Sequence, residues 1–278
     1  NHGIYGADAA TPSVTEALGK VEVRQGAWVA THEPSSVTSG GGYVLLLGNE
    51  VSNAGELITR KGQTALAAGD RFFIRKGIGT GENTASTTRG NEIAVGRNPD
   101  GEGRPVANPA GTVSNTGLIL AREGDVTLVG HEVRQEGVAA SSTTVNQRGT
   151  VHLLNAQSDA TGKVTLGKHA VTAVVIEDEG QTALDSQREA LIKESAVQDA
   201  LRNNTGRFDN YANLSDRRDQ SRVEIVSGSD VVFEGDSLTL ATGGQIAVQA
   251  GNRGLLADQA QLDVAGAVGV QVAMDANA

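Results

Sequence analysis

Compact acidic groups are the residues of this chain whose type and spacing come nearest to supporting chemistry. Residues 216–219 read Asp-Arg-Arg-Asp, and residues 177–179 read Glu-Asp-Glu. Two carboxylates about 5–10 Å apart can act together on a glycosidic bond. The arginines between the aspartates favour ion pairing on a helix surface instead, and the acidic run lacks calcium-loop spacing, which favours a solvated acidic loop. We predict no catalytic residue and no metal ligand at either place.

The other residues that could support chemistry form no recognisable motif. The five histidines lie at positions 2, 32, 131, 152 and 169, at least 17 residues apart. A zinc-binding helix places two histidines four residues apart. The absence of cysteine excludes disulfides, thiolate zinc sites and cysteine nucleophiles. We therefore expect no enzyme activity and no cofactor.

Composition and charge narrow the class of protein further. The net charge is −10, the chain has no marked basic patch, and apolar runs such as 44–47 are far too short to span a bilayer. We expect no nucleic-acid partner and no stable membrane insertion. Aromatic residues make up 3% of the chain and glycine 36 of its 278 residues. Such a composition favours a narrow aliphatic core with tight corners over a thick globular core.

An internal repeat indicates the secondary structure of the chain. Residues 51–66 read Val-Ser-Asn-Ala-Gly, six residues, then Gly-Gln-Thr-Ala-Leu, and a related phrase follows at 113–128 with an offset of 62. Shorter echoes occur at 162–167, 244–251 and 266–272, the last two starting 22 residues apart. Short strands recurring at a spacing of about twenty are typical of a β-solenoid, in which each coil stacks on the next. A β-sandwich is the alternative, although sandwiches rarely repeat a turn at constant offset.

Short strand-like runs bounded by Gly or Asn fit this interpretation; they lie at 21–23, 57–59, 72–74, 92–95, 150–154 and 223–226. Asn53, Gly55, Asn115 and Gly117 are expected in turns with positive φ, which Asn and Gly tolerate. About ten coils of about 22 residues would give a rod of about 50 Å. The residues predicted to form the core or its wall are Val51, Leu57, Ile58, Leu66, Val113, Leu120, Val126, Leu128, Val164, Leu166, Ile246 and Val248.

Two segments interrupt the predicted coils. The stretch 97–111 is too rich in Gly and Pro for a strand and is expected to be a loop. Residues 182–221 are predicted to form an inserted helical hairpin between coils at 1–181 and coils at 222–278, because apolar residues share one helical face over 182–202. We expect it to pack on the outside of the shaft, with a partner-binding knob as the alternative. The candidate partner contacts on or beside its second helix are Phe208, Tyr211, Asp216, Arg217, Arg218 and Asp219.

Several phrases together resemble the filamentous haemagglutinin-type exoproteins, which Gram-negative bacteria export by two-partner secretion. They are the stretches at 51–55, 108–117 (NPAGTVSNTG), 124–128, 145–155 (VNQRGTVHLLN) and 214–226 (LSDRRDQSRVEIV), and the resemblance covers about residues 44–272. It implies a right-handed parallel β-helix, secretion to the cell surface and a role in adhesion, biofilm formation or toxin delivery. The family's Asn-Pro-Asn motifs are only approximated, at 98–101 and 108–111. A complete secretion signal is therefore not expected in this stretch.

The sequence is thus expected to be a shaft fragment of a large secreted bacterial surface adhesin, continuing beyond residue 278. The resemblance implies an outer-membrane two-partner secretion transporter as partner of the full-length protein, with host-cell or matrix glycans or proteins as further partners. A carbohydrate-active β-helix enzyme acting on extracellular polysaccharide is one alternative, because parallel β-helices also host lyases and glycosidases. A passive stalk that presents a distal toxin or receptor-binding tip is the other.

Overall fold

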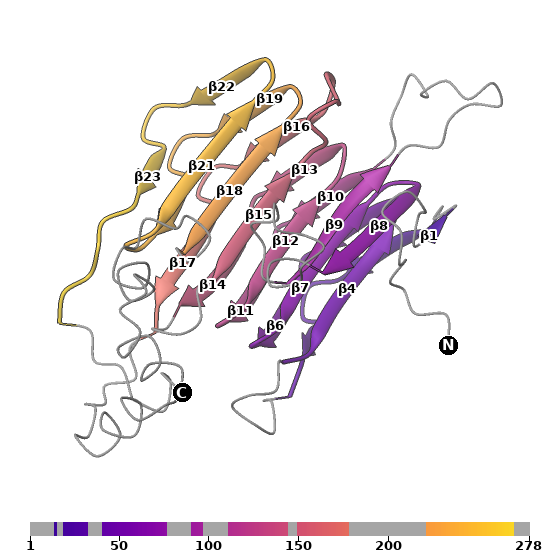
Figure 1. Cartoon of the computed structure of the whole chain (residues 1–278), viewed down its shortest axis with the longest axis horizontal. Helices are drawn as coiled ribbons and strands as arrows, with labels where there is room; N and C mark the ends of the chain where they lie inside the picture. The colour runs from indigo at the N-terminus through magenta and orange to yellow at the C-terminus, as the bar shows by residue number, and fades with distance from the viewer. Residues whose placement is uncertain are drawn as a thin grey trace, which may run out of the picture.

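The computed structural model describes residues 14–15, 19–32, 41–76, 90–96, 111–143, 149–177 and 221–269. These residues are all-β: the chain winds through three strands per coil, and equivalent strands of successive coils pair in parallel (Figure 1). The parallel β-solenoid predicted from the repeat is confirmed, while the right-handed winding stays a prediction. The described residues contain no helix that is long and apolar enough to cross a membrane.

Three parallel sheets form the sides of the column. Sheet I contains β2 (Lys20–Val23), β5 (Glu50–Asn53), β10 (Thr112–Asn115), β13 (Glu132–Gln135), β16 (Lys163–Leu166), β19 (Asp230–Phe233) and β22 (Arg253–Leu256). Sheet II contains β3 (Trp28–Ala30), β6 (Glu56–Arg60), β11 (Leu118–Arg122), β14 (Val138–Thr143), β17 (Val171–Ile176), β20 (Leu238–Ala241) and β23 (Gln261–Asp263). Sheet III contains β4 (Tyr43–Gly48), β7 (Gln63–Ala68), β12 (Asp125–Val129), β15 (Thr150–Leu154), β18 (Arg222–Ser227) and β21 (Gln245–Ala250).

The sequence repeat corresponds to direct stacking of neighbouring coils. Val51 pairs with Val113, and Leu66 pairs with Leu128, so the offset of 62 is a single coil step. The step is long because two strands that do not join the column, β8 (Arg71–Lys76) and β9 (Asn91–Gly96), come between β7 and β10 in the sequence; the next step, from Thr112 to its partner Glu132, takes the predicted twenty residues. The echo at 162–167 lies on sheet I rather than on the sheet III position of the phrase that it resembles.

The prediction of ten coils is wrong for the described residues. They form six complete three-strand coils and the first two strands of a seventh. Seven strands about 4.8 Å apart give a column of about 30 Å rather than 50 Å. The estimate failed because it divided all the non-helical residues by the coil length, whereas strands such as those at 71–76 and 91–96 belong to no coil. The predicted loop and helical insertion lie outside the described residues, except for Gly111 and Ser221.

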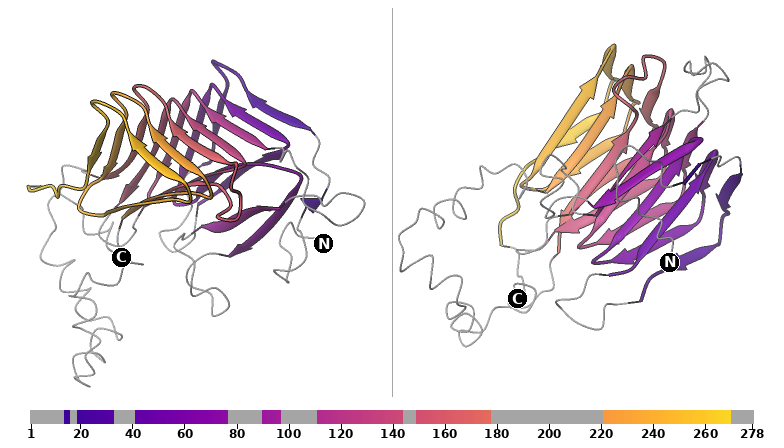
Figure 2. Two further views of the ribbon diagram at one scale, coloured as in Figure 1. Left: turned by 90° about the horizontal axis from the view of Figure 1, so that it is seen from above. Right: turned by 45° about the vertical axis from the view of Figure 1, so that its right-hand side comes forward.

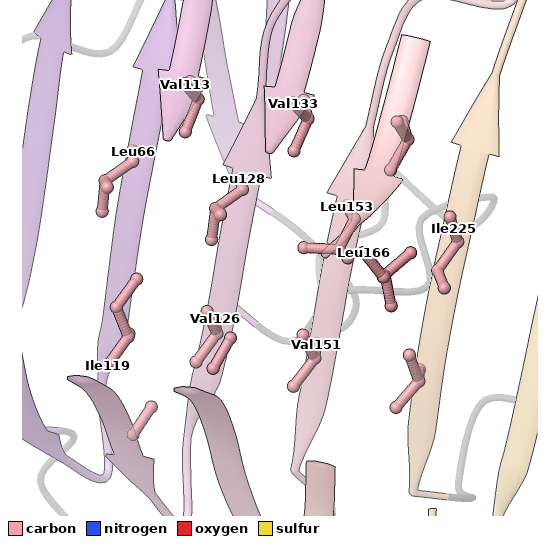
Figure 3. Packing of buried hydrophobic residues seen from close by; sticks show 14 of the residues in the cluster. Leu66, Val113, Ile119, Val126, Leu128, Val133, Val151, Leu153, Leu166 and Ile225 are labelled. Atoms are coloured by element: carbon pink, nitrogen blue, oxygen red, sulfur yellow. The ribbon is translucent and has the colours of Figure 1, made fainter. Parts of the chain in front are cut away.

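A continuous aliphatic core fills the column. Side chains at equivalent positions follow one another along the axis, as Leu66, Leu128, Leu153 and Ile225 do on sheet III (Figure 3). The predicted core residues with no exposed surface are Val51, Leu57, Leu66, Val113, Val126, Leu128, Val164 and Leu166.

The other four predicted core residues are less buried. Ile246 and Val248 continue the inward columns of Val223 and Ile225 on the last described strand of sheet III, where Ile246 is half-buried against the core and Val248 is 42% exposed. Ile58 and Leu120 alternate with the buried positions of their strands and therefore face outward. They belong to the outer side of the wall.

Asn53 and Asn115 do not occupy positive-φ turns, which corrects the prediction. Both end strands on sheet I and are buried, and Asn53 Nδ2 donates to Asn115 Oδ1 over 2.8 Å. Asn115 Nδ2 donates in turn to Gln135 Oε1 over 2.7 Å, so the amides form a ladder along the corner between sheets I and II. Stacked amides satisfy one another inside the core, where an unpaired amide would be costly.

The flanking glycines are also not required for positive φ. A Cβ on Gly117 would lie 2.2 Å from the carbonyl oxygen of Gly55, so stacking of the coils excludes a side chain there. Positive φ occurs at the next corner instead, at Lys61 (49°) and Glu123 (51°).

An antiparallel sheet beside the column was not predicted. It contains β1 (Val14–Thr15), β8 (Arg71–Lys76) and β9 (Asn91–Gly96), and Figure 2 shows it flanking the N-terminal coils. The sequence runs at 72–74 and 92–95 are therefore strands, but they pair antiparallel outside the coils. Their apolar residues, Phe72, Ile74 and Ile93, form a second buried cluster with outward residues of sheet III.

Candidate binding surfaces on the outer faces of the column

Alternation of side chains along each strand divides every sheet into an inward and an outward set. The inward set is the packed core, so groups available to a partner must lie on outward faces or at corners. The three outward faces have different chemical character.

The outward face of sheet I carries charged and hydroxyl side chains in two columns, the second of which ends in Val232 and Leu255. The first column is Lys20, Glu50, Thr112, Glu132, Lys163, Asp230 and Arg253, and the second is Glu22, Ser52, Ser114, Arg134, Thr165, Val232 and Leu255. Four of these residues are basic and four acidic. The face is therefore polar but electrically balanced.

Ion pairs connect neighbouring coils on this face. Lys20 Nζ lies 2.9 Å from Glu50 Oε1, and this hydrogen bond raises the pKa of Lys20. Arg253 and Asp230 approach to 3.6 Å, and Arg134 bonds Glu132 within one strand over 2.7 Å. Because these side chains are largely exposed, their pairing fixes charge positions more than it stabilises the fold.

The outward face of sheet II is aliphatic over its central strands. Its outward residues include Leu118, Val138, Val171 and Leu238 in one column and Ile58, Leu120, Ala140, Ala173 and Leu240 in the next. Most of these side chains are half-buried, which is normal for aliphatics that contact their neighbours along a sheet. Toward the ends of the same columns stand the polar residues Glu56, Gln261 and Asp263, so the aliphatic surface is confined to the central strands.

The outward face of sheet III is covered by the antiparallel sheet over its N-terminal strands. Leu45, Leu47, Ala65, Ala67, Val129 and Leu154 contact or join the second cluster. Gln63 of sheet III is hydrogen-bonded to the antiparallel sheet at Asn91. Its Oε1 accepts from Asn91 N, and its Nε2 donates to Asn91 O. Further along the sheet, the nearly buried His152 places Nε2 3.2 Å from Glu224 Oε2, and Arg222 donates to Gln245.

A charged network lies where β17 ends. Arg122 binds both carboxylate oxygens of Glu177, with Nε–Oε1 2.9 Å and Nη2–Oε2 2.8 Å, and Ser142 donates to Oε1. The Arg122 hydrogen bonds hold the pKa of the Glu177 carboxyl below its ordinary value, despite the opposing effect of burial. Glu177 is thus an ion-paired residue rather than part of a solvated acidic loop, which corrects that expectation; Asp178 and Glu179 lie outside the described residues.

A second polar network closes the corner between sheets III and I. His131 Nδ1 lies 2.6 Å from Asp159 Oδ2, and Asp159 Oδ1 accepts from the Thr161 backbone and hydroxyl. Asn155 Nδ2 donates to the carbonyl oxygens of Gly130 and His131. A histidine–carboxylate pair can act in general base catalysis. Here, however, both oxygens of the Asp159 carboxylate are hydrogen-bonded to residues of the same corner. Within the described ranges, no group of three or more His, Cys, Asp or Glu side chains is placed to hold a metal ion.

The six predicted partner contacts, from Phe208 to Asp219, all lie in the interval 178–220 and outside the described residues, so the structure does not place them. The outward faces of sheets I and II were not predicted as sites. Their signal was present in the sequence as alternation, for example Leu118, Leu120 and Arg122 against buried Ile119 and Ala121. It was missed because alternation alone does not tell which set faces outward.

Comparison with known proteins gives no relative for this chain. No family model, no curated protein and no solved structure matches it.

Proposed function

We propose that this chain is a structural and binding segment of a large secreted bacterial surface adhesin of the filamentous haemagglutinin type. The observation that carries the proposal is the long exposed face of sheet I, where charged and hydroxyl groups repeat at every coil of a rigid column. The sequence phrases that resemble that family support the same proposal. In the full-length protein, a two-partner secretion transporter would export the shaft to the cell surface.

The chemistry of sheet I suits an extended partner better than a small ligand. Its groups recur at the coil spacing of about 4.8 Å, so a polymer lying along the axis can contact several coils at once. Weak contacts added along one rigid surface give avidity without a deep pocket. The balanced charge disfavours a strongly anionic partner and fits neutral or zwitterionic glycans and protein surfaces.

A binding screen with the whole chain tests the proposal. The purified protein is applied to a glycan array and to immobilised matrix proteins, and hits are titrated with a variant in which Arg134 and Arg253 are changed to Ala. Lys168→Ala is the matched control, because Lys168 is exposed in a turn outside sheet I. We expect saturable binding that weakens at least tenfold in the double variant and is unchanged in the control.

The other outcomes identify the alternatives. Release of shortened glycan products would indicate a carbohydrate-active enzyme. Absence of binding to every glycan and protein tested would favour a passive stalk. Binding that is equally strong in the double variant would place the contact away from this face.

A further inference from the structure

The tryptophan at the start of sheet II is the most exposed aromatic side chain among the described residues. Trp28 begins the first outward column of this sheet and is 66% exposed. Tryptophan often anchors a binding surface, because its rigid ring buries a large area at little cost in conformational entropy. An exposed ring that continues into an apolar surface therefore marks a place of contact.

The next residue of the same column is a carboxylate without a partner. Glu56 pairs in register with Trp28, so the two side chains point outward from strands about 4.8 Å apart. In the part of the chain that the structure describes, the Glu56 side chain forms no hydrogen bond and no ion pair. The Arg24 guanidinium pairs with Glu22 over 3.4 Å instead. Arg60, at the other end of the Glu56 strand, is about 13 Å away along the backbone.

The side chains around this pair are aliphatic and half-buried: Ala30, Ile58, Leu118 and Leu120. Apart from the indole N–H of Trp28, the Glu56 carboxylate is the only hydrogen-bonding group among these six side chains. A ring face, an unpaired negative charge and an aliphatic surface thus lie side by side at this end of the sheet.

This combination matches the side chain of a lysine or an arginine. Such a side chain has an aliphatic stem, which packs on apolar surface, and a charged head, which extends beyond it. A cation over the face of an aromatic ring is attracted by the ring electrons, and Trp is the strongest aromatic side chain in this respect. Glu56 supplies the opposite charge beside the same ring.

Other occupants fit this place less well. A neutral sugar has several hydroxyl groups that need partners, and the aliphatic neighbours supply none. A second copy of the chain is disfavoured, because two molecules of net charge −10 repel each other. The same acidic charge attracts a basic protein at long range.

We propose that Trp28 and Glu56 form a docking point for a basic segment of another protein. One lysine or arginine side chain of that segment lies against the indole ring and pairs with the Glu56 carboxylate. The aliphatic residues beside them contact the stem of that side chain. This contact goes beyond the adhesin proposal, since it lies on sheet II and does not require the face of sheet I.

The fluorescence of Trp28 tests the proposal directly, because the chain contains no other tryptophan. The whole chain is titrated with an amidated peptide of alternating lysine and leucine, and in parallel with the same peptide acetylated on its lysines. Glu56→Gln removes the charge and keeps the shape. The matched control is Asp258→Asn, which removes an exposed charge from the last described coil. Calorimetric titration of Trp28→Leu measures the contribution of the ring, and each variant is first shown to unfold near the wild-type midpoint.

We expect the lysine peptide to change the Trp28 emission saturably and to bind about three- to fivefold more weakly to Glu56→Gln and to Trp28→Leu. Asp258→Asn should bind as the wild type does, and the acetylated peptide should bind more weakly than the unmodified one. Equal losses in Glu56→Gln and Asp258→Asn would overturn the proposal, because they would show attraction by net charge alone. Unchanged emission, or a response to a neutral oligosaccharide without a response to the peptide, would overturn it as well.

Discussion

At the scale of single residues, stacking of the coils lets one buried series of amide side chains satisfy one another. Asn115 accepts from Asn53 on one neighbouring coil and donates to Gln135 on the other. Amide side chains that recur at one corner meet on successive coils, so the repeat of Asn53 at Asn115 is also a hydrogen-bond contact.

Removing one step of the ladder should be costly. Asn115→Ala leaves two buried amides without their partner, and we expect a loss of about 2–3 kcal/mol of unfolding free energy. Urea denaturation measures the loss. Ser114→Ala, on the outward side of the same strand, is the matched control and should change stability by less than about 0.5 kcal/mol. Equal effects of the two changes would contradict a structural role for the ladder.

Glu177 should make stability depend on pH in the acid range. Its pKa is lowered in the folded protein by the Arg122 hydrogen bonds. Its stabilising contribution is therefore fully present above the unfolded-state pKa and is lost as the pH falls through the folded-state value. We expect Glu177→Gln to lower stability by about 1–2 kcal/mol at neutral pH, with a smaller difference at about pH 3. Urea midpoints at both pH values give the comparison, and a difference that grows on acidification would refute this assignment.

At the scale of elements, the strands of the column and the flanking sheet are stabilised by different cores. The antiparallel strands β8 and β9 turn one side toward sheet III and the other away from it. On β8, Phe72 is fully buried whereas its neighbour Phe73 is half-buried. Sheet III is consequently covered on both faces at its N-terminal strands, which explains why all six residues of β7 are buried.

This arrangement predicts unequal effects for adjacent phenylalanines. Phe72→Ala should cost about 3–5 kcal/mol, the usual range for a large aromatic removed from a core. Phe73→Ala, on the opposite side of the same strand, should cost much less. Chemical denaturation of both variants is the measurement. A greater loss for Phe73 would mean that the hairpin packs on the column by its other side.

At the scale of the whole molecule, the column is a linear stack in which each coil contacts only its neighbours. Interior strands such as β12 pair on both edges, whereas β22 and β23 each pair on one edge within the described residues. Side chains near that end are also exposed, among them Leu256 at 52%. Stability in such a stack is a sum of nearest-neighbour terms, so it should fall toward its ends.

Hydrogen exchange should reveal this gradient. We expect the amides of residues 112–154 to exchange slowest and those of 253–263 to exchange much faster, because the end coil opens without disrupting the rest. Mass spectrometry of peptic peptides measures both regions in one experiment. Uniform protection along the column would indicate instead that it unfolds as one cooperative unit or that the end coil is covered.

The internal repeat was enough to predict a parallel solenoid, and its offset was enough to predict which strands of the central coils stack. This was possible because stacked coils repeat their sequence pattern. The spacing of Val51 and Val113 in the repeat therefore indicates that the two residues pair. The strand runs at 150–154 and 223–226 were likewise legible from local alternation. Eight of the predicted core residues proved fully buried for the same reason.

Only the tertiary structure decided the direction in which ambiguous apolar residues face and the path of the chain between coils. Ile58 and Leu120 alternate like core residues, yet they lie on the outside, because both faces of sheet II are aliphatic and periodicity cannot distinguish them. The strands at 72–74 and 92–95 look like coil strands, but they pair antiparallel outside the column, where their apolar residues pack against outward residues of sheet III. Asn53 resembles a turn residue, but its hydrogen bond to Asn115 on the neighbouring coil makes it part of a buried amide ladder. Long-range contacts of this kind are absent from any local pattern.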